Sequence, residues 1–424
     1  MAQWHKKTQD FLNQERSLFE TVNLADHWGE QADFRPSFSS KNRLKTSPYQ
    51  TVFFNTFQYG KETDIWDEQV TGGGAAVYNV DASNITLSVG STAGDKVVRQ
   101  TRAVMRYIPG RTSTLSFAIR LEAPVAGVRR RFGIFDDNNG AFFEDNGGVY
   151  SYVIRSKTSG VVEETRVGRD DWNGDKLDGN GWSQHTADPT KQQMINIEYE
   201  WYGAGQVKFS WVIGGETITS HTFSHANTID KVWSSTPFLP IRLELENVTG
   251  AAGTHYVYQG SNSLISEGEP EKLGILVSQA TDTAGRTMAT SDTYYPILSI
   301  RLKSNNLTGI VLPRSLQVAT NDNTNVFWKL VRNATLTGAS WQAHDDPDSF
   351  MEYDLSATAM TGGTNTLNGF TIGGGSSLTD IDDKASLQLG RSNLGTVSDI
   401  YTLACASPNT NKSALAVLNW IEQR

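Results

Sequence analysis

The sequence predicts an all-β protein with two β-sandwich domains of jelly-roll or lectin-like type, preceded by a short N-terminal amphipathic helix. Three observations predict this class. Segments that alternate apolar and polar residues, or are rich in β-branched and aromatic residues, recur along most of the chain. Only one segment shows helical periodicity, and turn residues separate the rest, with 38 glycines among 424 residues. At roughly 100–200 residues per domain, this length suggests two to four domains.

The composition argues against several classes of partner and of covalent or membrane-bound structure. The net charge is −9, which argues against binding to nucleic acid or to an anionic membrane surface. Cys405 is the one cysteine, so no internal disulfide is expected. No apolar run reaches the roughly 18 residues of a membrane helix, and the N-terminus has no apolar core of a signal peptide. We therefore expect synthesis in a cytoplasm and no membrane insertion.

Residues 1–28 are expected to form an anchor helix. Five apolar residues there fall on one stripe at a period near 3.6, namely Phe11, Leu12, Leu18, Phe19 and Val22. An amphipathic helix at a chain end must bury its stripe, either on its own first domain or on a neighbouring subunit. Residues 29–48 are polar and irregular and are expected to be a linker.

Residues 49–265 are expected to form the first sandwich. The predicted strands are 85–89, 102–107, 114–121, 131–135, 149–155, 193–201, 206–213 and 240–246. The clearest hairpin joins 193–201 to 206–213 through the turn 202–205. Each of these two strands has one apolar face at period 2, which is typical of a half-buried antiparallel sheet.

Residues 266–424 are expected to form the second sandwich, after a polar stretch that starts at residue 261 and puts the boundary near residue 266. The predicted strands are 297–303, 308–312, 326–332, 349–355, 386–389, 400–406 and 414–421. At about 150 residues, this segment has an ordinary domain size.

Several long stretches resemble a family of tailed-bacteriophage virion structural proteins, many from aquatic phages. They include RRRFGIFDDNNGAFFEDNGGVYSYVIRSKTSG (129–160), RDDWNGDKLDGNG (169–181), INIEYEWYGAGQVKFSWVIGG, SHTFSHAN (220–227), YPILSIRLKS (295–304), VFWKLVRNATLTGASW (326–341) and LACASPNTNKSALAVLNWIEQR (403–424). The opening FLNQERSLFE (11–20) looks like the N-terminal segment of phage particle proteins of this kind. The resemblance implies a part of a virus particle, with other virion proteins as partners, and leaves open which part.

One loop carries a calcium pattern. Asp171, Asn173 and Asp175 have the 1, 3, 5 spacing of oxygen ligands in a calcium-binding turn. Lys176 stands where an EF-hand needs Gly, and Trp182 where it needs Glu. Asx-turns explain the same composition without metal, so calcium is the one cofactor to test and no other is expected.

Two tryptophans of the same loop, Trp172 and Trp182, are candidates for an exposed role. An exposed loop tryptophan suits sugar stacking and a subunit interface equally well. The acidic segment 136–140 follows a strand and reads as a turn, with Gly140 free to take positive φ.

Glu198 and Glu200 are the best enzymatic candidates. Two carboxylates on one strand face lie about 7 Å apart, within the range that glycoside hydrolases use. The hairpin register that pairs Trp201 with Val207, however, sets Glu200 opposite Lys208 as an ordinary cross-strand charge pair. No coherent catalytic constellation remains, so we expect that the protein is not an enzyme.

The sequence thus predicts a virion component, displayed on capsid or tail, anchored by its N-terminal segment and working through protein interfaces, with a homo-oligomer as the default. The alternative is a fibre or spike protein that binds a host surface glycan. A polysaccharide-degrading enzyme is the third hypothesis.

Overall fold

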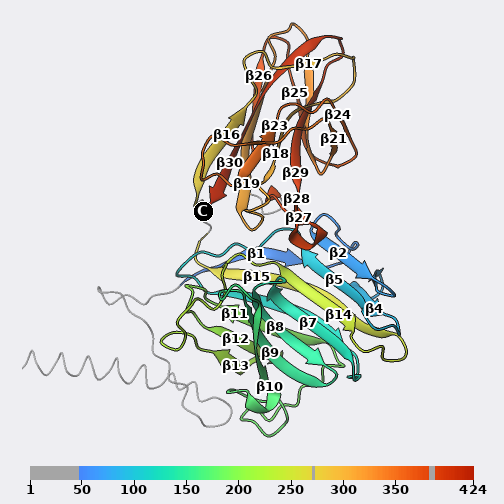
Figure 1. Cartoon of the computed structure of the whole chain (residues 1–424), viewed down its shortest axis with the longest axis vertical. Helices are drawn as coiled ribbons and strands as arrows, with labels where there is room; N and C mark the ends of the chain where they lie inside the picture. The colour runs from blue at the N-terminus through green and yellow to red at the C-terminus, as the bar shows by residue number, and fades with distance from the viewer. Residues whose placement is uncertain (1–46, 270–272, 382–386) are drawn as a thin grey trace, which may run out of the picture.

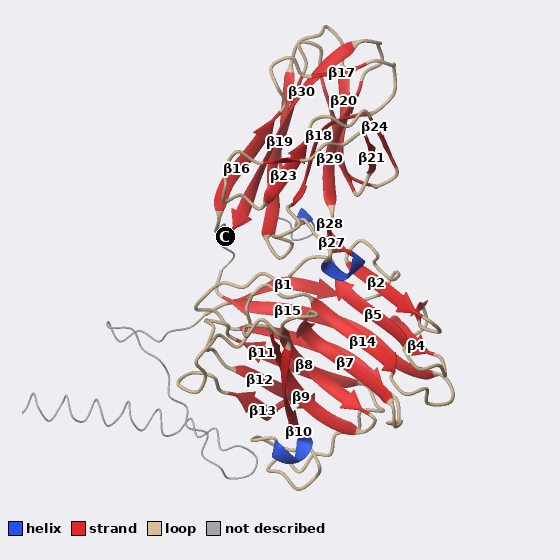
Figure 2. Ribbon diagram, viewed as in Figure 1, coloured by secondary structure: helices blue, strands red, loops and turns tan. Residues whose placement is uncertain are grey.

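A computed structural model describes residues 47–269, 273–381 and 387–424. Two β-sandwiches are stacked end to end, with β1 to β15 in one and β16 to β30 in the other (Figure 1). The predicted anchor stripe Phe11, Leu12, Leu18, Phe19 and Val22 lies outside the described residues, as does nearly all of the predicted linker. Within the described part, strands dominate and helix is limited to single 3₁₀ turns (Figure 2). The prediction of an all-β chain is confirmed.

The first sandwich has an eight-stranded and a seven-stranded antiparallel sheet. The order of the eight-stranded sheet is β13-β12-β11-β6-β15-β4-β3, with β1 also paired to β15. Its strands are β1 Tyr49–Asn55, β3 Ala75–Asn79, β4 Asn84–Val89, β6 Ser113–Leu121, β11 Gln193–Tyr199, β12 Val207–Ile213, β13 Glu216–Phe223 and β15 His255–Glu267.

The order of the seven-stranded sheet is β10-β9-β8-β7-β14-β5-β2. Its strands are β2 Trp66–Thr71, β5 Asp95–Thr101, β7 Val128–Phe135, β8 Gly140–Asn146, β9 Val149–Ser156, β10 Glu163–Gly168 and β14 Ile241–Asn247. Alternate residues of both sheets face each other and form one core, for example Phe117 of β6 against Phe132 of β7, with ring centroids 5.4 Å apart. The 3₁₀ turn η1 Arg169–Asp171 follows β10.

The second sandwich has a five-stranded sheet, β16-β30-β19-β26 with β17 also on β30, and a six-stranded sheet, β22-β23-β18-β29-β20-β25. The first contains β16 Ile275–Ala280, β17 Arg286–Met288, β19 Ile310–Ala319, β26 Ser376–Asp380 and β30 Lys412–Gln423. The second contains β18 Tyr295–Leu302, β20 Val326–Arg332, β22 Gln342–Ala343, β23 Met351–Asp354, β25 Thr364–Thr371 and β29 Ile400–Ala406. Two short pairs complete it, β21 Thr335–Thr337 with β24 Ala359–Thr361 and β27 Arg391–Ser392 with β28 Val397–Ser398, next to the 3₁₀ turn η3 Asn393–Gly395.

The structure corrects three sequence-based expectations. Residues 102–107, predicted as a strand, and residues 387–389 form none. The polar residues 261–267, expected to lead out of the first domain, continue β15 to Glu267 because Leu264 is buried between the sheets and Asn262 and Ser266 keep their ladder partners. The first sandwich therefore ends with β15 at Glu267 and the second begins with β16 at Ile275, just after the position near residue 266 that the sequence suggested.

The segment 102–107 contacts the second sandwich instead. Val104 packs with Ile310 and Leu312 of β19 in a small apolar cluster. The backbone N–H of Arg391 donates to Arg102 O (2.9 Å), and Gln388 Nε2 donates to Val104 O (3.0 Å). The Arg102 guanidinium lies 3.3 Å from the Asp399 carboxylate, and Asp67 accepts the backbone N–H of Leu394. The apolar residues read as a strand are thus buried in two places, Val104 at the interface with the second sandwich and Met105 and Tyr107 in the core of the first.

Candidate functional site

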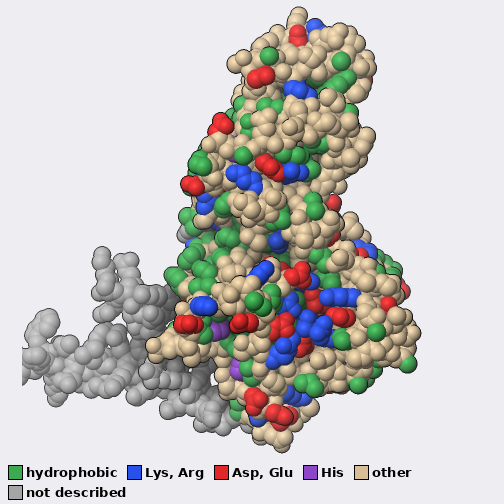
Figure 3. Space-filling model, viewed as in Figure 1, with side chains coloured by type: hydrophobic (Ala, Val, Ile, Leu, Met, Phe, Trp, Pro, Cys, Tyr) green, Lys and Arg blue, Asp and Glu red, His purple; other side chains and the backbone are tan. Residues whose placement is uncertain are grey.

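The outer face of the seven-stranded sheet carries a dense set of charged side chains, which we call the charged face (Figure 3). Alternation along each strand points them away from the core. The charged face consists of Lys96, Arg129, Arg131, Glu144, Arg155, Glu164, Arg166, Arg242, Glu244 and Glu246, with Asp137 from the β7–β8 turn.

The middle of the charged face is buried by its own ion pairs. Arg131 lies between two carboxylates, 2.6 Å from Glu144 and 3.5 Å from Glu244. Glu244 is also 2.6 Å from Arg242, whose guanidinium reaches Asp137 at 2.7 Å. Side chains of Glu144, Glu244 and Arg242 are at most 4 % exposed. Pairing of this kind is what makes burial of so many charges tolerable.

An aromatic pair lies beneath these guanidinium groups. Phe135 and Phe142 are fully buried on the outer side of the sheet, with ring centroids 4.4 Å apart. Arg155 lies 5.0 Å from the Phe142 centroid, and Arg242 lies 5.6 Å from that of Phe135. Gly133 gives the rings room, because a Cβ there would lie 2.7 Å from Phe142 Cβ. The arginines therefore cover apolar surface as well as pairing with acids.

The pKa values of three carboxylates of the charged face, Glu144, Glu164 and Glu244, are lowered. Burial raises the pKa of Glu244, but the charges of Arg242, Lys96 and Arg131 outweigh it and lower the pKa to about 2. Burial also raises the pKa values of Glu144 and Glu164. Hydrogen bonds from neighbouring arginines outweigh this effect, so both pKa values are lowered. A glycosidase needs one carboxylic acid with a raised pKa to protonate the leaving group. Glu144, Glu164 and Glu244 do not meet that requirement.

The predicted pair Glu198 and Glu200 lies in a hairpin whose register differs from the expected one. The hairpin register pairs Tyr199 with Val207, two residues away from the expected alignment, so Glu198 is opposite Lys208. Lys208 Nζ lies 2.9 Å from Glu198 Oε1. Glu200 follows the end of β11, where its backbone N–H donates to Gln206 O. The expected cross-strand ion pair exists, but Glu198 forms it in place of Glu200.

The calcium pattern is spread over separate structural roles. Asp175 is 1 % exposed, and its carboxylate accepts the backbone N–H groups of Leu177 and Ser183 at 2.7 Å each. The Asn173 side chain donates to Thr222 O and accepts from Thr222 N, which clamps the loop to β13. Asp171 is exposed in η1. Within the described ranges, no three or more His, Cys, Asp or Glu side chains group as metal ligands.

The two candidate tryptophans differ. Trp172 is 5 % exposed, stacked on Tyr152 with centroids 4.4 Å apart, and donates to Val167 O. An exposed role for Trp172 is therefore wrong, because its indole completes the core beside β9. Trp182 is 46 % exposed and keeps the candidate role. The segment 136–140 is a turn, since Asn138 and Asn139 donate backbone N–H groups to Asp136 and Gly140 has φ 132°.

The outer face of the five-stranded sheet has the opposite character, and we call it the uncharged face. Strand register places on it Leu276, Ser278, Ala280, Ser315, Gln317, Ala319, Ser376, Leu378, Leu415, Val417, Asn419 and Ile421. Leu276 and Leu378 are each 65 % exposed. Asp380 of β26, which pairs with Ser315, also lies on this face and is charged. Such a face usually carries polar residues when it meets water.

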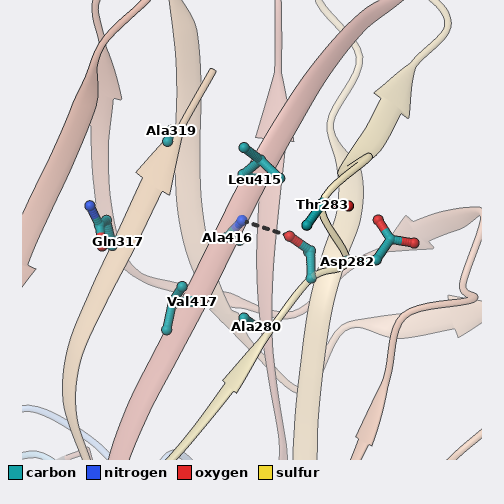
Figure 4. Close-up of a pocket in the computed structure, with 9 residues that line it drawn as sticks. Ala280, Asp282, Thr283, Gln317, Ala319, Leu415, Ala416 and Val417 are labelled. Atoms are coloured by element: carbon teal, nitrogen blue, oxygen red, sulfur yellow. Dashed lines mark hydrogen bonds between the residues drawn. The ribbon is translucent and has the colours of Figure 1, made fainter. Parts of the chain in front are cut away.

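A groove of about 330 Å³ lies on the uncharged face (Figure 4). Its floor is formed by Ala319, Leu415 and Val417, and the loop 281–283 after β16 forms one wall. The backbone N–H of Ala416 donates to Thr281 Oγ1 (3.2 Å), which fixes that loop against β30. The walls add polar groups to this floor, from Gln317 and from Thr281, Asp282 and Thr283 of the loop. Sequence reasoning missed this face because β16 and β26 were not among the predicted strands.

The comparisons with known proteins give no family. No family model matches the chain, and no curated protein matches it. Solved structures similar to about half of the chain include the cellulose-induced protein Cip1 (14 % identity, 50 % of this chain and 96 % of that chain, TM-score 0.33) and the Bacillus licheniformis β-glucanase (12 %, 54 % and 100 %, 0.32). The legume lectin-like domain from Entamoeba histolytica is another (9 %, 47 % and 89 %, 0.28). At these identities and TM-scores, the likeness supports no statement about activity.

No helix among the described residues is long and apolar enough to cross a membrane.

Proposed function

We propose that this chain is a structural component of a bacteriophage particle, displayed on capsid or tail, anchored by its N-terminal segment and working through protein–protein interfaces. The observation that carries the proposal is the uncharged face, where Leu276 and Leu378 are exposed on opposite edge strands and Ile421, Val417, Leu415, Ala280 and Ala319 lie among the residues between them. Contiguous exposed apolar surface marks protein interaction sites in soluble proteins. The resemblance of the sequence to virion proteins supplies the kind of partner, other virion proteins or further copies of the chain.

The charged face supports a non-enzymatic role. Its buried acids are ionised and paired, so no proton donor for glycoside cleavage stands among Glu144, Glu164 and Glu244. Its guanidinium groups are engaged with neighbouring acids and aromatic rings. We interpret it as a layer that stiffens the first sandwich. A rigid sandwich of this kind suits a particle surface protein.

Immunogold electron microscopy of purified particles tests the proposal, with antibody raised against residues 273–424. Gold on the head would assign a capsid position, and gold on the tail a baseplate or fibre position. A chain lacking residues 1–28 should fold, because the described strands start at Tyr49, yet should be absent from particles. Unlabelled particles, with the protein present in the lysate, would refute the proposal.

A second function, recognition of a host surface glycan by a lectin-like first sandwich, is favoured by Trp182. This side chain is 46 % exposed in the loop between β10 and β11, and a flat exposed indole suits stacking on a sugar ring. Glycan-array binding that Trp182→Ala removes would support it. Trp172→Ala is the unsuitable probe, because loss of a buried indole unfolds the loop itself. A blank array with the intact protein would count against this second function.

A further inference from the structure

The uncharged face mixes apolar residues with small polar ones, and two of its leucines, Leu276 and Leu378, are each 65 % exposed. Along β30, alternate residues Ala416, Leu418 and Trp420 point into the core, while Leu415 and Val417 point outward. On β16, at the sheet edge, Leu276 is more exposed than the core residue Val277 (65 % against 6 %). Natural sheets normally protect an edge strand with charged side chains. The outward positions of the edge strand β16, which are Leu276, Ser278 and Ala280, carry none. The pattern indicates that another element covers the face.

The N-terminal segment, residues 1–46, joins the described fold on the side of the second sandwich where β16 starts. The backbone N–H of Gly268 donates to Pro48 O at 2.7 Å, so residues 1–46 leave the described fold at the end of β15. Gly268 and Ile275, the first residue of β16, are seven residues apart, which limits their separation to about 25 Å. The point where residues 1–46 join the described fold therefore lies within about 25 Å of the start of β16.

The length and composition of the N-terminal segment suit this position. Residues 11–22 carry the apolar stripe of Phe11, Leu12, Leu18, Phe19 and Val22. As a helix, twelve residues would be about 18 Å long, close to the roughly 20 Å of a six-residue strand such as β16. Residues 23–46 are 24 residues (46 − 22) and can span at most about 80 Å, enough to reach the face.

We propose that residues 11–22 dock through their apolar stripe on the uncharged face of the second sandwich. An apolar stripe has no reason to select the charged face, where binding would desolvate charges that already have partners. The uncharged face offers apolar surface and a groove of about 330 Å³ for one large side chain. The inference rests on the proposed function in one respect, the anchoring role of residues 11–22. It names the receptor of that anchor as the second sandwich of the same or a neighbouring copy.

Disulfide trapping in the purified full-length protein tests the docking. Gln14 is three residues after Phe11 and four before Leu18, so Gln14→Cys would place a thiol at the edge of the stripe without removing an apolar residue or the charge of Glu15. Its partners are Ser278→Cys and, separately, Ser376→Cys, both exposed on the uncharged face at opposite edges. The native Cys405 is fully buried and does not interfere. The control partner is Val161→Cys, 69 % exposed on the first sandwich.

We expect at least one of the two face pairs to form a disulfide under mild oxidation at least tenfold faster than the control pair. A cross-linked monomer would assign docking to the chain's own second sandwich, and a cross-linked dimer, absent from the single-cysteine variants, to a neighbouring copy. Adding Leu18→Asp and Phe19→Asp should return the rate to that of the control. Face pairs that react no faster than the control would overturn the docking.

The two proposals fail separately. Loss of the cross-link is measured on purified protein and leaves the particle-labelling result unchanged. Absence of the protein from particles would refute the proposed function without altering the cross-linking rates.

Discussion

The charged face of the first sandwich and the uncharged face of the second occupy equivalent places, each on the outside of an antiparallel sheet whose inside packs a core. The centre of the first face is shielded from solvent by its own side chains, because Arg131, Arg242 and their acidic partners bury one another. The second has a single carboxylate, Asp380, among the outward residues given above, and Leu276 and Leu378 remain exposed. A sheet face whose charged side chains pair with one another contributes to stability. A sheet face with exposed apolar side chains is available to a partner.

The difference has an energetic consequence for substitutions. Buried ion pairs cost desolvation, so removal of one member leaves an unpaired charge in a poorly solvated place. Exposed apolar residues contribute little to folding, and their replacement changes mainly what can bind. Variants of the two faces should therefore separate stability from association.

The largest effect is expected for Glu244→Gln on the charged face. The change leaves Arg242 and Arg131 without their shared carboxylate, and breaking a buried pair costs about 3–5 kcal/mol. Urea unfolding of the full chain measures it. Glu198→Gln is the matched control, because the Glu198–Lys208 pair is 39 % and 35 % exposed and should contribute at most about 1 kcal/mol. Equal losses in the two variants would show that the charged face is no more than a set of surface pairs.

Acid should weaken the charged face next. The pKa of Glu244 is lowered from 4.5 to about 2 in the folded protein, so its contribution is complete above pH 4.5 and is lost as the pH falls from about 4.5 to 2. The shift corresponds to about 3 kcal/mol at most. Calorimetry between pH 7 and pH 3 measures this loss for the first sandwich. Glu244→Gln should flatten the pH dependence, and an unchanged slope would contradict the assignment.

A smaller loss is expected at the rim of the charged face. Arg166 is 40 % exposed and pairs with Glu144 at 2.8 Å, while Arg131 holds the same carboxylate from the other side. Arg166→Gln should therefore cost about 1 kcal/mol, because water and Arg131 replace much of the interaction. Thermal unfolding gives the value. A cost as large as that of Glu244→Gln would mean that rim and centre do not differ.

The smallest effect on stability is expected on the uncharged face. Leu276→Asp combined with Leu378→Asp should change the free energy of unfolding by no more than about 0.5 kcal/mol, since both side chains are 65 % exposed. The same variant should lose incorporation into particles and cross-linking to residue 14. Normal incorporation and cross-linking would show that the uncharged face has no partner.

Periodicity was sufficient for strands with a clean inner and outer face. Ile195, Ile197 and Tyr199 alternate in burial with their neighbours, and β11 lies where the pattern predicts it. The hairpin register was missed by two residues because the turn is longer than 202–205: Glu200 and Gln206 are hydrogen-bonded beyond the strand ends. Short-range patterns do not determine how many residues form the turn, and the length of the turn sets the register of the two strands.

Candidate sites were harder to predict than strands. The 1, 3, 5 spacing of Asp171, Asn173 and Asp175 is real, but Asp175 faces inward to hold the backbone of its own loop and Asn173 holds β13. Trp172 looked like a loop residue, yet its contact with Tyr152, twenty residues earlier, buries it. Such outcomes depend on which distant strand the loop packs against.

The sequence by itself determined the all-β class and the direction in which most strand residues point, because alternation at period 2 is a local property of the chain. The tertiary structure decided what those directions mean. Arg129, Arg130 and Arg131 are adjacent in sequence, yet Arg130 pairs with Asp145 inside the sandwich while the other two pair on its outer face. Partners contributed by β8 and β14 make that run a buried charge layer. The outward positions of β16, β19, β26 and β30 instead carry mainly uncharged residues, with Asn419 bonded to Ser315 and with Leu276 and Leu378 exposed.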